Sequence, residues 1–183
     1  QDFLIFEVLE EEFEDFFVEV LEKFPGLDED KCLALDSKRF YEIRVAVPRS
    51  VYEYISNNQL LKLGTDAQVS PQFFKDMIYT YRDMSAKGIE TVLFGHIGDA
   101  HLHLNFLPTK DQYEQCQAML DDFYGKLIEL EGSPFAEHGI GTIKKRFITR
   151  FYTEEVLKTF KELKSKMDPR GVFFPMGFMG IND

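Results

Sequence analysis

The sequence predicts an α+β fold: a ferredoxin-like antiparallel sheet with helices packed on one face, built from two strand-helix-strand halves with inserted helices. Segments of strand and helix type follow one another in the order β-α-β, inserted helices, then β-β-α-β. Two alternating segments joined by a glycine-containing turn indicate an antiparallel pair in the second half. With 183 residues, 44% of them hydrophobic, the chain can bury one core without disulfides.

The first half begins with two expected strands around a helix. Residues 3–9 alternate as a strand does. Residues 11–23 are expected to be helical, because phenylalanines and aliphatic residues recur on one helical face. Pro25-Gly26 ends this helix, and the short apolar segment 31–35 is expected to be the second strand.

Inserted helices come next. Residues 37–47 and 51–58 are expected to form two short helices, because Pro48 cannot sit inside a continuous helix. Residues 66–69 are expected to be extended. Ser70-Pro71 supplies an N-cap and a first-turn proline for a helix that reaches Lys87, with Gly88 as its C-cap.

The second half contains the clearest strands. We expect strands over 90–94 and 101–106, a long helix over 111–130 and a short strand over 133–136. Thr153 caps a last helix that reaches about Met167, and the Asp-Pro-Arg-Gly sequence after it predicts a turn.

Charge and cysteine content exclude several classes of protein. The net charge is −11 and the pI about 4.9, so the basic surface needed for nucleic acid or an anionic membrane is absent. No apolar run approaches the roughly 20 residues of a transmembrane segment. Cys32 and Cys116 form no CxxC pair, which indicates reduced, buried thiols. We expect a cytoplasmic protein, with peripheral membrane contact as the open alternative.

Three of the four histidines lie in FGHIGDAHLHLN, residues 94–105. Because strand side chains alternate, His101, His103 and Asn105 share one face, and the leucines share the other face, toward the helices. Unpaired polar groups buried on the first face would cost about 1–3 kcal/mol each. The face is therefore either a site or a solvent-facing polar strand that happens to contain histidines.

The turn before this strand brings further polar groups toward it. Gly95 and Gly98 permit a tight approach that could fold His96 back toward His103. Asp99 in the same turn could orient one of the imidazoles.

The fourth histidine follows a carboxylate in FAEHGIG. Two histidines and a carboxylate are a recurring ligand set for a divalent transition metal with open positions, and Glu137 can supply the carboxylate. Its neighbour His138 points to the opposite face of an extended chain. If the turn rotates His138 toward the open positions, it becomes a candidate general base.

These segments resemble a known family. GHIGDAHLHLN resembles the Gly-His-x-Gly-Asp-x-x-x-His-x-Asn motif in the C-terminal domain of FAD-linked oxidases and dehydrogenases of the vanillyl-alcohol-oxidase type. That family includes glycolate oxidase and the D-lactate and D-2-hydroxyglutarate dehydrogenases. AEHGIGTIKK is similar to its second motif, MDPRGVFF to its Asp-Pro-x-Gly segment, and FLIFEVLEEEF to the start of the domain. The likeness covers nearly the whole chain.

The resemblance implies a cap domain that binds substrate and faces the isoalloxazine ring of FAD. It implies a divalent metal, zinc first with manganese or iron as alternatives, held by His96, His103 and Glu137. His138 matches the residue that takes the proton of the substrate hydroxyl. Asn105 matches a polar residue of the substrate pocket.

Two cations are also implied as substrate contacts. Arg44, in RFYEIR, falls where the family has Trp-x-x-Arg and would pair with the substrate carboxylate. Lys62, in KLGTD, would be a second contact. The alternatives are a helix-surface ion pair for Arg44 and a solvated lysine for Lys62. His101 has no assigned role: an extra pocket residue and a plain strand histidine both remain open.

The sequence departs from the family pattern at three places. Tyr41 replaces the usual tryptophan, Ala100-His101 stands where many members have Gly-Asn, and FFPMGFMG replaces an Asn-Pro-Gly-Lys-like segment near the flavin. Residues that contact the cofactor therefore stay unassigned.

We expect residues 1–183 to be a single cap and substrate domain, the C-terminal part of a longer flavoenzyme, because no dinucleotide-binding glycine loop is present. The full-length enzyme would oxidise a small D-2-hydroxy acid to the 2-oxo acid with FAD held mainly by its other domain, and this part alone would be inactive. The electron acceptor is left open. The alternatives are a stand-alone metal- or ligand-binding module without redox activity and the cap of a metal-free flavin alcohol oxidase.

Overall fold

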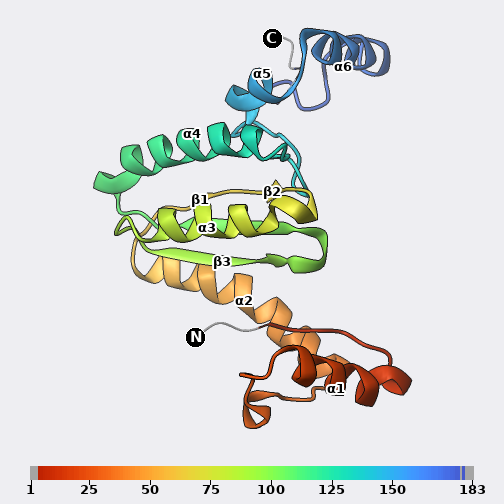
Figure 1. The fold of residues 1–183 in the computed structure, drawn as a ribbon. Helices are drawn as coiled ribbons and strands as arrows, with labels where there is room; N and C mark the ends of the chain where they lie inside the picture. The colour runs from red at the N-terminus through yellow and green to blue at the C-terminus, as the bar shows by residue number, and fades with distance from the viewer. Residues whose placement is uncertain (1–3, 178, 180–183) are drawn as a thin grey trace. The chain divides into compact units, whose positions relative to one another are not determined.

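The structure is a computed structural model that describes residues 4–177 and 179. The chain divides into two compact units, Gln1–Pro48 and Arg49–Asp183. Figure 1 shows the helices and strands, coloured from red at the N-terminus to blue at the C-terminus. The first unit contains the 3₁₀ helices η1 (Glu10–Glu12) and η2 (Glu29–Lys31), the helix α1 (Phe13–Lys23) and the beginning of α2 (Ser37–Asn57).

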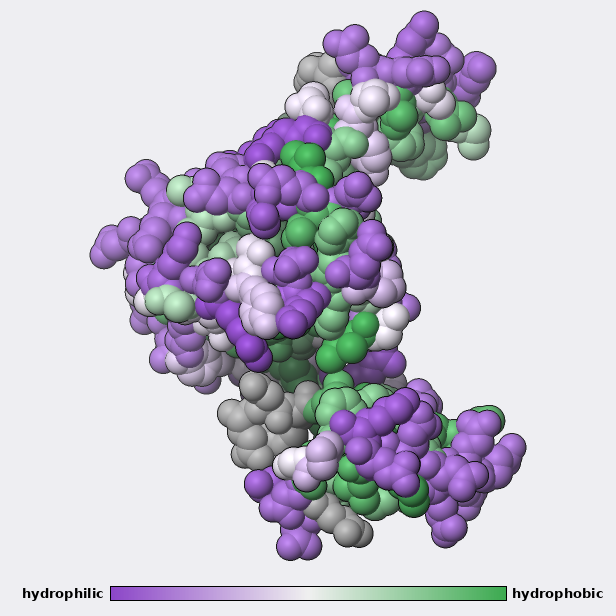
Figure 2. Space-filling model, viewed as in Figure 1, coloured by the Kyte–Doolittle hydropathy of each residue, from purple (hydrophilic) through white to green (hydrophobic). Residues whose placement is uncertain are grey.

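Helix α1 confirms the predicted helix over 11–23, with η1 as its first turn. Phenylalanine rings cluster on it: Phe13 stacks on Phe17 with ring centroids 6.0 Å apart, and Phe6 meets Phe16 edge to face at 5.2 Å. Hydrophobic side chains nevertheless remain on the surface of this unit among hydrophilic ones (Figure 2), and none of the residues of α1 is fully buried.

Both strands expected in the first unit are wrong for the residues described. Residues 4–9 form neither helix nor strand, and Phe3 lies outside the described residues. Residues 32–35, after η2, are likewise irregular. The apolar side chains there stay exposed, Leu33 by 82%. A strand needs a neighbour for its backbone groups, and alternation in the sequence does not supply one.

Helix α2 corrects the expected pair of short helices. It runs unbroken over Ser37–Asn57 with Pro48 inside it. Proline removes one N–H donor and crowds the carbonyl four residues earlier, but the other helical hydrogen bonds remain available. The loss of a single bond was therefore not enough to end the helix.

The second unit is built on a four-stranded antiparallel sheet around β4 (His101–Phe106). The strand β3 (Thr91–His96) pairs along one side of β4 over all six residues. On the other side lie β1 (Leu63–Gly64) and β2 (Ala67–Gln68). Gly64 pairs with Asn105 and Ala67 with Leu102, so two residues on each strand separate the pairings and the register is unbroken. Asp66 therefore stands opposite His103.

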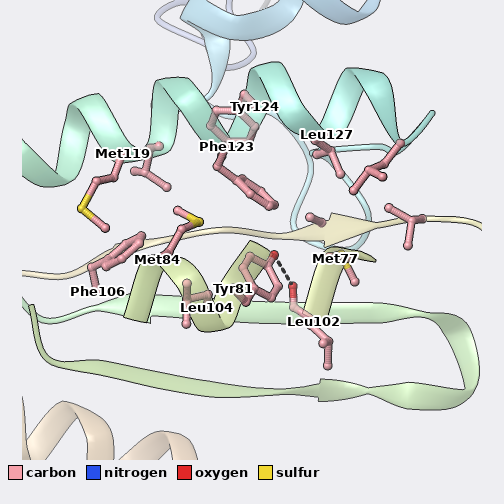
Figure 3. Packing of buried hydrophobic residues seen from close by; sticks show 14 of the residues in the cluster. Met77, Tyr81, Met84, Leu102, Leu104, Phe106, Met119, Phe123, Tyr124 and Leu127 are labelled. Carbon is pink, nitrogen blue, oxygen red and sulfur yellow. Dashed lines mark hydrogen bonds between the residues drawn. The ribbon is translucent and has the colours of Figure 1, made fainter. Parts of the chain in front are cut away.

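Helices cover the leucine face of this sheet, which confirms the α+β class and the predicted orientation of β4. They are α3 (Phe74–Ser85), preceded by η3 (Pro71–Phe73), and α4 (Tyr113–Glu129), preceded by η5 (Lys110–Gln112). Figure 3 shows their buried residues packed together with those of β4. The core residues drawn there include Met77, Tyr81, Met84, Leu102, Leu104, Phe106, Met119, Phe123, Tyr124 and Leu127.

The remaining segments complete the second unit. The strand expected over 133–136 is wrong, because only an isolated bridge joins Gln68 and Ser133 there. The helices η6 (Lys145–Phe147) and α5 (Ile148–Phe151) were not predicted. Helix α6 (Glu154–Met167) confirms the last predicted helix, and the Thr153 side chain accepts from Val156 N at its start.

Both cysteines are free, and Cys116 is buried as predicted, whereas Cys32 is only half-buried. Among residues 4–177 and 179, no helix combines the length and apolar composition needed to cross a membrane.

Candidate metal and substrate site

The hairpin of β3 and β4 places three imidazoles side by side. His96 is the last residue of β3 and pairs with His101, and Phe94 pairs with His103. The ring centroids of His101 and His103 are 4.4 Å apart, and those of His96 and His101 are 6.0 Å apart. His96 therefore lies next to His101, not folded back over His103 as expected. The polar face of β4 is buried: His101 is 5% exposed and His103 6%.

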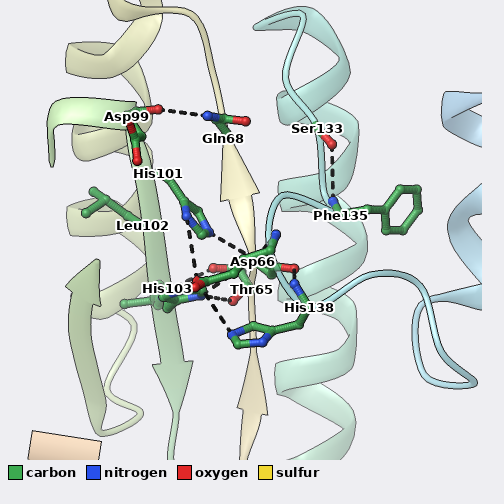
Figure 4. A network of polar contacts seen from close by, with 12 residues as sticks. Thr65, Asp66, Gln68, Asp99, His101, Leu102, His103, Ser133, Phe135 and His138 are labelled. Atoms are coloured by element: carbon green, nitrogen blue, oxygen red, sulfur yellow. Dashed lines mark hydrogen bonds and ion pairs between the residues drawn. The ribbon is translucent and has the colours of Figure 1, made fainter. Parts of the chain in front are cut away.

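A buried carboxylate links this hairpin to the second histidine motif. Asp66, between β1 and β2, is 2% exposed. Its Oδ1 accepts from His101 Nε2 at 2.9 Å and from the Glu137 backbone N–H at 3.2 Å. Its Oδ2 accepts from the His138 backbone N–H at 3.0 Å and from Lys144 Nζ at 2.5 Å. Figure 4 shows Asp66 among the imidazoles of His101, His103 and His138.

These contacts keep Asp66 ionised. Burial raises the pKa of its carboxyl, but the hydrogen bond from Lys144, the His138 amide, the charge of Lys144 and the bond from His101 together lower the pKa below its ordinary value. An ionised carboxylate only accepts hydrogen bonds, so His101 Nε2 carries the proton of that bond. In the tautomer that carries its proton on Nε2, the other ring nitrogen of His101, Nδ1, is an acceptor.

His103 has the opposite tautomer for the same reason. Its Nδ1 lies 3.3 Å from the carbonyl oxygen of Thr65, which can only accept, so Nδ1 carries the proton and Nε2 is bare. Burial lowers the pKa of the His103 imidazole, and the neighbouring His101 lowers it further. The neutral form is therefore favoured at neutral pH.

The bare nitrogens converge on Glu137. Its Oε2 lies 3.3 Å from His103 Nε2 and 4.0 Å from His101 Nδ1. Ligand atoms of His96, His101 and Glu137 lie within 4.8 Å of one another. Lone pairs of two imidazoles and one carboxylate thus face one another, which is the donor set that a divalent transition cation prefers.

Asp66 could form a second such cluster with His103 and His138, whose ligand atoms also lie within 4.8 Å of one another. Each oxygen of Asp66 already accepts two hydrogen bonds, however. The carboxylate therefore orients its neighbours and has no lone pair left to direct at an ion.

His138 and Asn105 lie beside the converging donors. The His138 ring centroid is 5.2 Å from that of His103, and its side chain is 68% exposed, so the turn has rotated it toward the cluster while leaving it accessible. Asn105, two residues from His103 on the same face, is 3% exposed. Its Nδ2 has no hydrogen-bond partner in the described part of the chain. That amide is therefore a buried donor without an acceptor among the described residues.

The two predicted cations, Lys62 and Arg44, belong to different units of the chain. Lys62 is exposed, and its Nζ bonds to the hydroxyl of Tyr52 at 3.4 Å and lies 4.8 Å from the centre of the ring. Lys62 precedes Asp66 by four positions in the segment that contains β1, which corresponds to about 13 Å between the two residues along an extended chain. Arg44 is an exposed residue of α2 and belongs to the first unit.

Sequence reasoning missed Asp66 and Lys144, and it named Asp99 as the orienting acid. The Asp99 backbone carbonyl accepts from Gln68 Nε2, while the carboxylate that contacts His101 belongs to Asp66. One signal was available, since Asp66 is the single acid in an otherwise uncharged extended segment, GTDAQV.

Comparison with known proteins identifies the family of this chain. The chain matches the family described as FAD linked oxidases, C-terminal domain, over residues 6–176. It therefore belongs to that family.

Several curated relatives are named as oxidases or dehydrogenases. The glycolate oxidase subunit GlcD of Bacillus subtilis (strain 168) is 32% identical over 114 residues, which cover 60% of this chain and 24% of the relative. The mitochondrial D-lactate dehydrogenase [cytochrome] of Kluyveromyces lactis is 29% identical over 112 residues, 61% of this chain and 19% of the relative. The mitochondrial D-2-hydroxyglutarate dehydrogenase of Rattus norvegicus is 26% identical over 151 residues, 82% of this chain and 28% of the relative. The chain thus spans between 19% and 28% of these relatives.

Proposed function

We propose that this chain is the substrate- and metal-binding cap of an FAD-dependent enzyme that oxidises a small D-2-hydroxy acid to the 2-oxo acid. The observation that carries the proposal is the bare Nε2 of His103 only 3.3 Å from Glu137 Oε2. Two bare acceptors at that distance repel each other, and a bound cation would remove the repulsion. Family membership supports the FAD part of the proposal, and the names of the relatives support the substrate class.

His96, His103 and Glu137 fit a divalent metal by the chemistry of their donors. Imidazole and carboxylate together suit zinc, manganese and iron. The metal would stabilise alkoxide character on the substrate hydroxyl and so lower the cost of removing its proton. The hydroxyl and carboxylate oxygens of a 2-hydroxy acid can chelate one ion, which explains why this substrate class fits the site.

The other residues bind substrate or move its proton. His138 is exposed next to His103, and its imidazole would receive the hydroxyl proton while the flavin supplies the hydride acceptor. The unpaired Nδ2 of Asn105 would donate to a substrate oxygen. Arg44, assigned by motif, would hold the substrate carboxylate, and Lys62 would add positive charge near it.

The metal assignment is tested with Glu137→Gln in the full-length enzyme. Glutamine keeps the shape of the side chain and removes the charge that balances a dication. We expect metal content measured by mass spectrometry and turnover to be lost together, with flavin content unchanged. Glu129→Gln, which changes an exposed acid paired with Lys126 on α4, should leave both at the wild-type level. Full turnover with no metal in Glu137→Gln would refute the proposal.

The assignment of the base is tested separately with His138→Asn. Removing a general base typically costs about 10²–10⁴-fold in rate. We expect kcat to fall by that range while KM and metal content stay close to wild type. Near-normal kcat would assign proton removal to another group.

A further inference from the structure

We propose that His101 is an additional ligand of this metal, so that three imidazoles and one carboxylate hold the ion. The ligand set would be His96, His101, His103 and Glu137. The inference rests on the proposed function, because it concerns the same ion, but it assigns a residue to which the family motif gives no role.

The first observation is the direction of the His101 ring. Asp66 accepts from Nε2 at 2.9 Å, which leaves Nδ1 bare and fixes the ring about that bond. Nδ1 lies 4.0 Å from Glu137 Oε2, so a second imidazole nitrogen without a proton lies near the carboxylate oxygen that His103 already approaches. A cation between them would replace repulsion with two bonds. His101 thus repeats, with the other nitrogen, the arrangement found at His103.

The second observation is the place of His101 between the other donors. It pairs with His96 across the β3–β4 hairpin, and His96, His101 and Glu137 bring ligand atoms within 4.8 Å of one another. Ligand atoms on one tetrahedral zinc lie roughly 3.4 Å apart, given bonds of about 2.1 Å. Small rotamer adjustments would therefore close these donors on one ion.

The third observation is the buried carboxylate of Asp66 next to the His101 imidazole. A metal-bound imidazole commonly donates its other N–H to a carboxylate, which fixes the ring and makes the nitrogen a stronger ligand. Asp66 occupies that position, and Lys144, with its side chain 13% exposed, balances the charge of Asp66. A histidine that served only to fill the strand would not need a buried ion pair to orient it.

An extra imidazole has a chemical consequence. Nitrogen ligands favour zinc, iron and other transition metals over magnesium and calcium, so His101 would sharpen the selectivity of the site for transition metals. Substrate oxygens would then bind by expanding the coordination beyond the four protein ligands.

Cobalt(II) substitution of the full-length protein tests this without relying on activity. A ring N–H on a cobalt-bound imidazole gives a strongly shifted proton signal, and burial with a hydrogen bond slows its exchange. We expect two slowly exchanging shifted signals in the wild type, from Nε2–H of His101 and Nδ1–H of His103. His101→Asn should lose one signal and weaken cobalt binding by about 10–100-fold. Asp99→Asn, in the exposed turn before β4, should keep both signals and the affinity.

The outcomes separate this inference from the proposed function. A wild-type protein that binds no cobalt at the site overturns both. Cobalt binding with one slowly exchanging signal, or an unchanged spectrum and affinity in His101→Asn, overturns only the role of His101. The wild-type spectrum decides the question even if His101→Asn does not fold.

Discussion

Asp66 is a buried charge whose partners come from three separate parts of the chain. Its carboxylate accepts from His101 on β4, from the Glu137–His138 backbone and from Lys144. A buried carboxylate without partners would be strongly unfavourable, so the arrangement is stable only with all of them in place. The same bonds set the tautomer of His101 and fix the turn that presents Glu137.

Replacing Asp66 by asparagine is therefore expected to destabilise the chain. The change leaves the largely buried Lys144 ammonium without its counter-charge, and breaking a buried pair in this way costs about 3 kcal/mol. The free energy of unfolding, measured by urea denaturation followed by circular dichroism, should fall by about that amount. Asp99→Asn, at an exposed acid, should stay within about 0.5 kcal/mol of wild type. Equal effects of the two substitutions would contradict the role of Asp66.

The free energy of unfolding of the metal-free chain is expected to decrease in two steps as the pH is lowered. The pKa of folded His103 lies below its ordinary value of 6.5, so as the pH drops below that value the unfolded chain binds a proton that the folded chain does not. The pKa of folded Asp66 lies below 3.8, so its contribution is present above that pH and lost below it. Urea denaturation across this range measures both steps. His103→Gln should flatten the step at higher pH and leave the step at lower pH in place. A profile that this substitution does not change would contradict the assignment of the first step to His103.

Sequence motifs pointed to some of the individual residues of the candidate site. His103 and Glu137 stand out by residue type and spacing, and the structure brings Nε2 and Oε2 of the pair to 3.3 Å. Asp66 did not stand out, because its partners lie 35 to 78 positions away. Such contacts follow from strand register, which a single sequence does not reveal.

Among the elements, helices were predicted better than strands. The periodicity of α1, α3, α4 and α6 is a local property, and each was confirmed. Strands β3 and β4 were also confirmed, because a short turn supplies each with its partner. Where the partner had to come from far away, strands were predicted that do not form: alternation predicted one that included residues 4–9, and a short apolar run predicted one that included residues 32–35. Helix α2 shows the converse, since its local stop signal, Pro48, was overridden.

The hairpin of β3 and β4 is expected to depend on Gly95. An added Cβ there would lie 2.4 Å from the carbonyl oxygen of His101 and 2.8 Å from Leu102 Cα, so backbone on the central strand would have to move. Gly95→Ala should reduce the free energy of unfolding by about 3 kcal/mol or more. Gly98→Ala is the matched control, because a Cβ there meets no atom within 4 Å, and it should cost less than about 0.5 kcal/mol. Urea denaturation of both variants measures the difference. Equal decreases in the free energy of unfolding would mean that the close approach of β4 does not restrict the side chain at position 95.

At the scale of the whole molecule, the proposed metal donors are assembled from segments that the sheet brings together, and all of them belong to the second unit. The proposed metal donors come from β3, β4 and the turn after α4, and the acid that orients them comes from between β1 and β2. If the proposed ion binds there, this chain would hold it independently of any flavin-binding part. Metal retention and flavin retention should be separable properties.

Chelation of the full-length enzyme tests that separation. Dialysis against a strong chelator should remove the metal and leave the flavin absorbance unchanged, because no described donor of the metal site is proposed to bind FAD. Turnover should fall on the order of a hundredfold or more, since the metal supplies several kcal/mol of charge stabilisation to the reacting oxygen. Adding back zinc should restore it, and dialysis without chelator provides the control. Turnover that survives complete metal removal would favour the metal-free alcohol oxidase alternative. A full-length protein that binds metal but no flavin would favour the stand-alone binding module, because binding without redox activity needs no flavin.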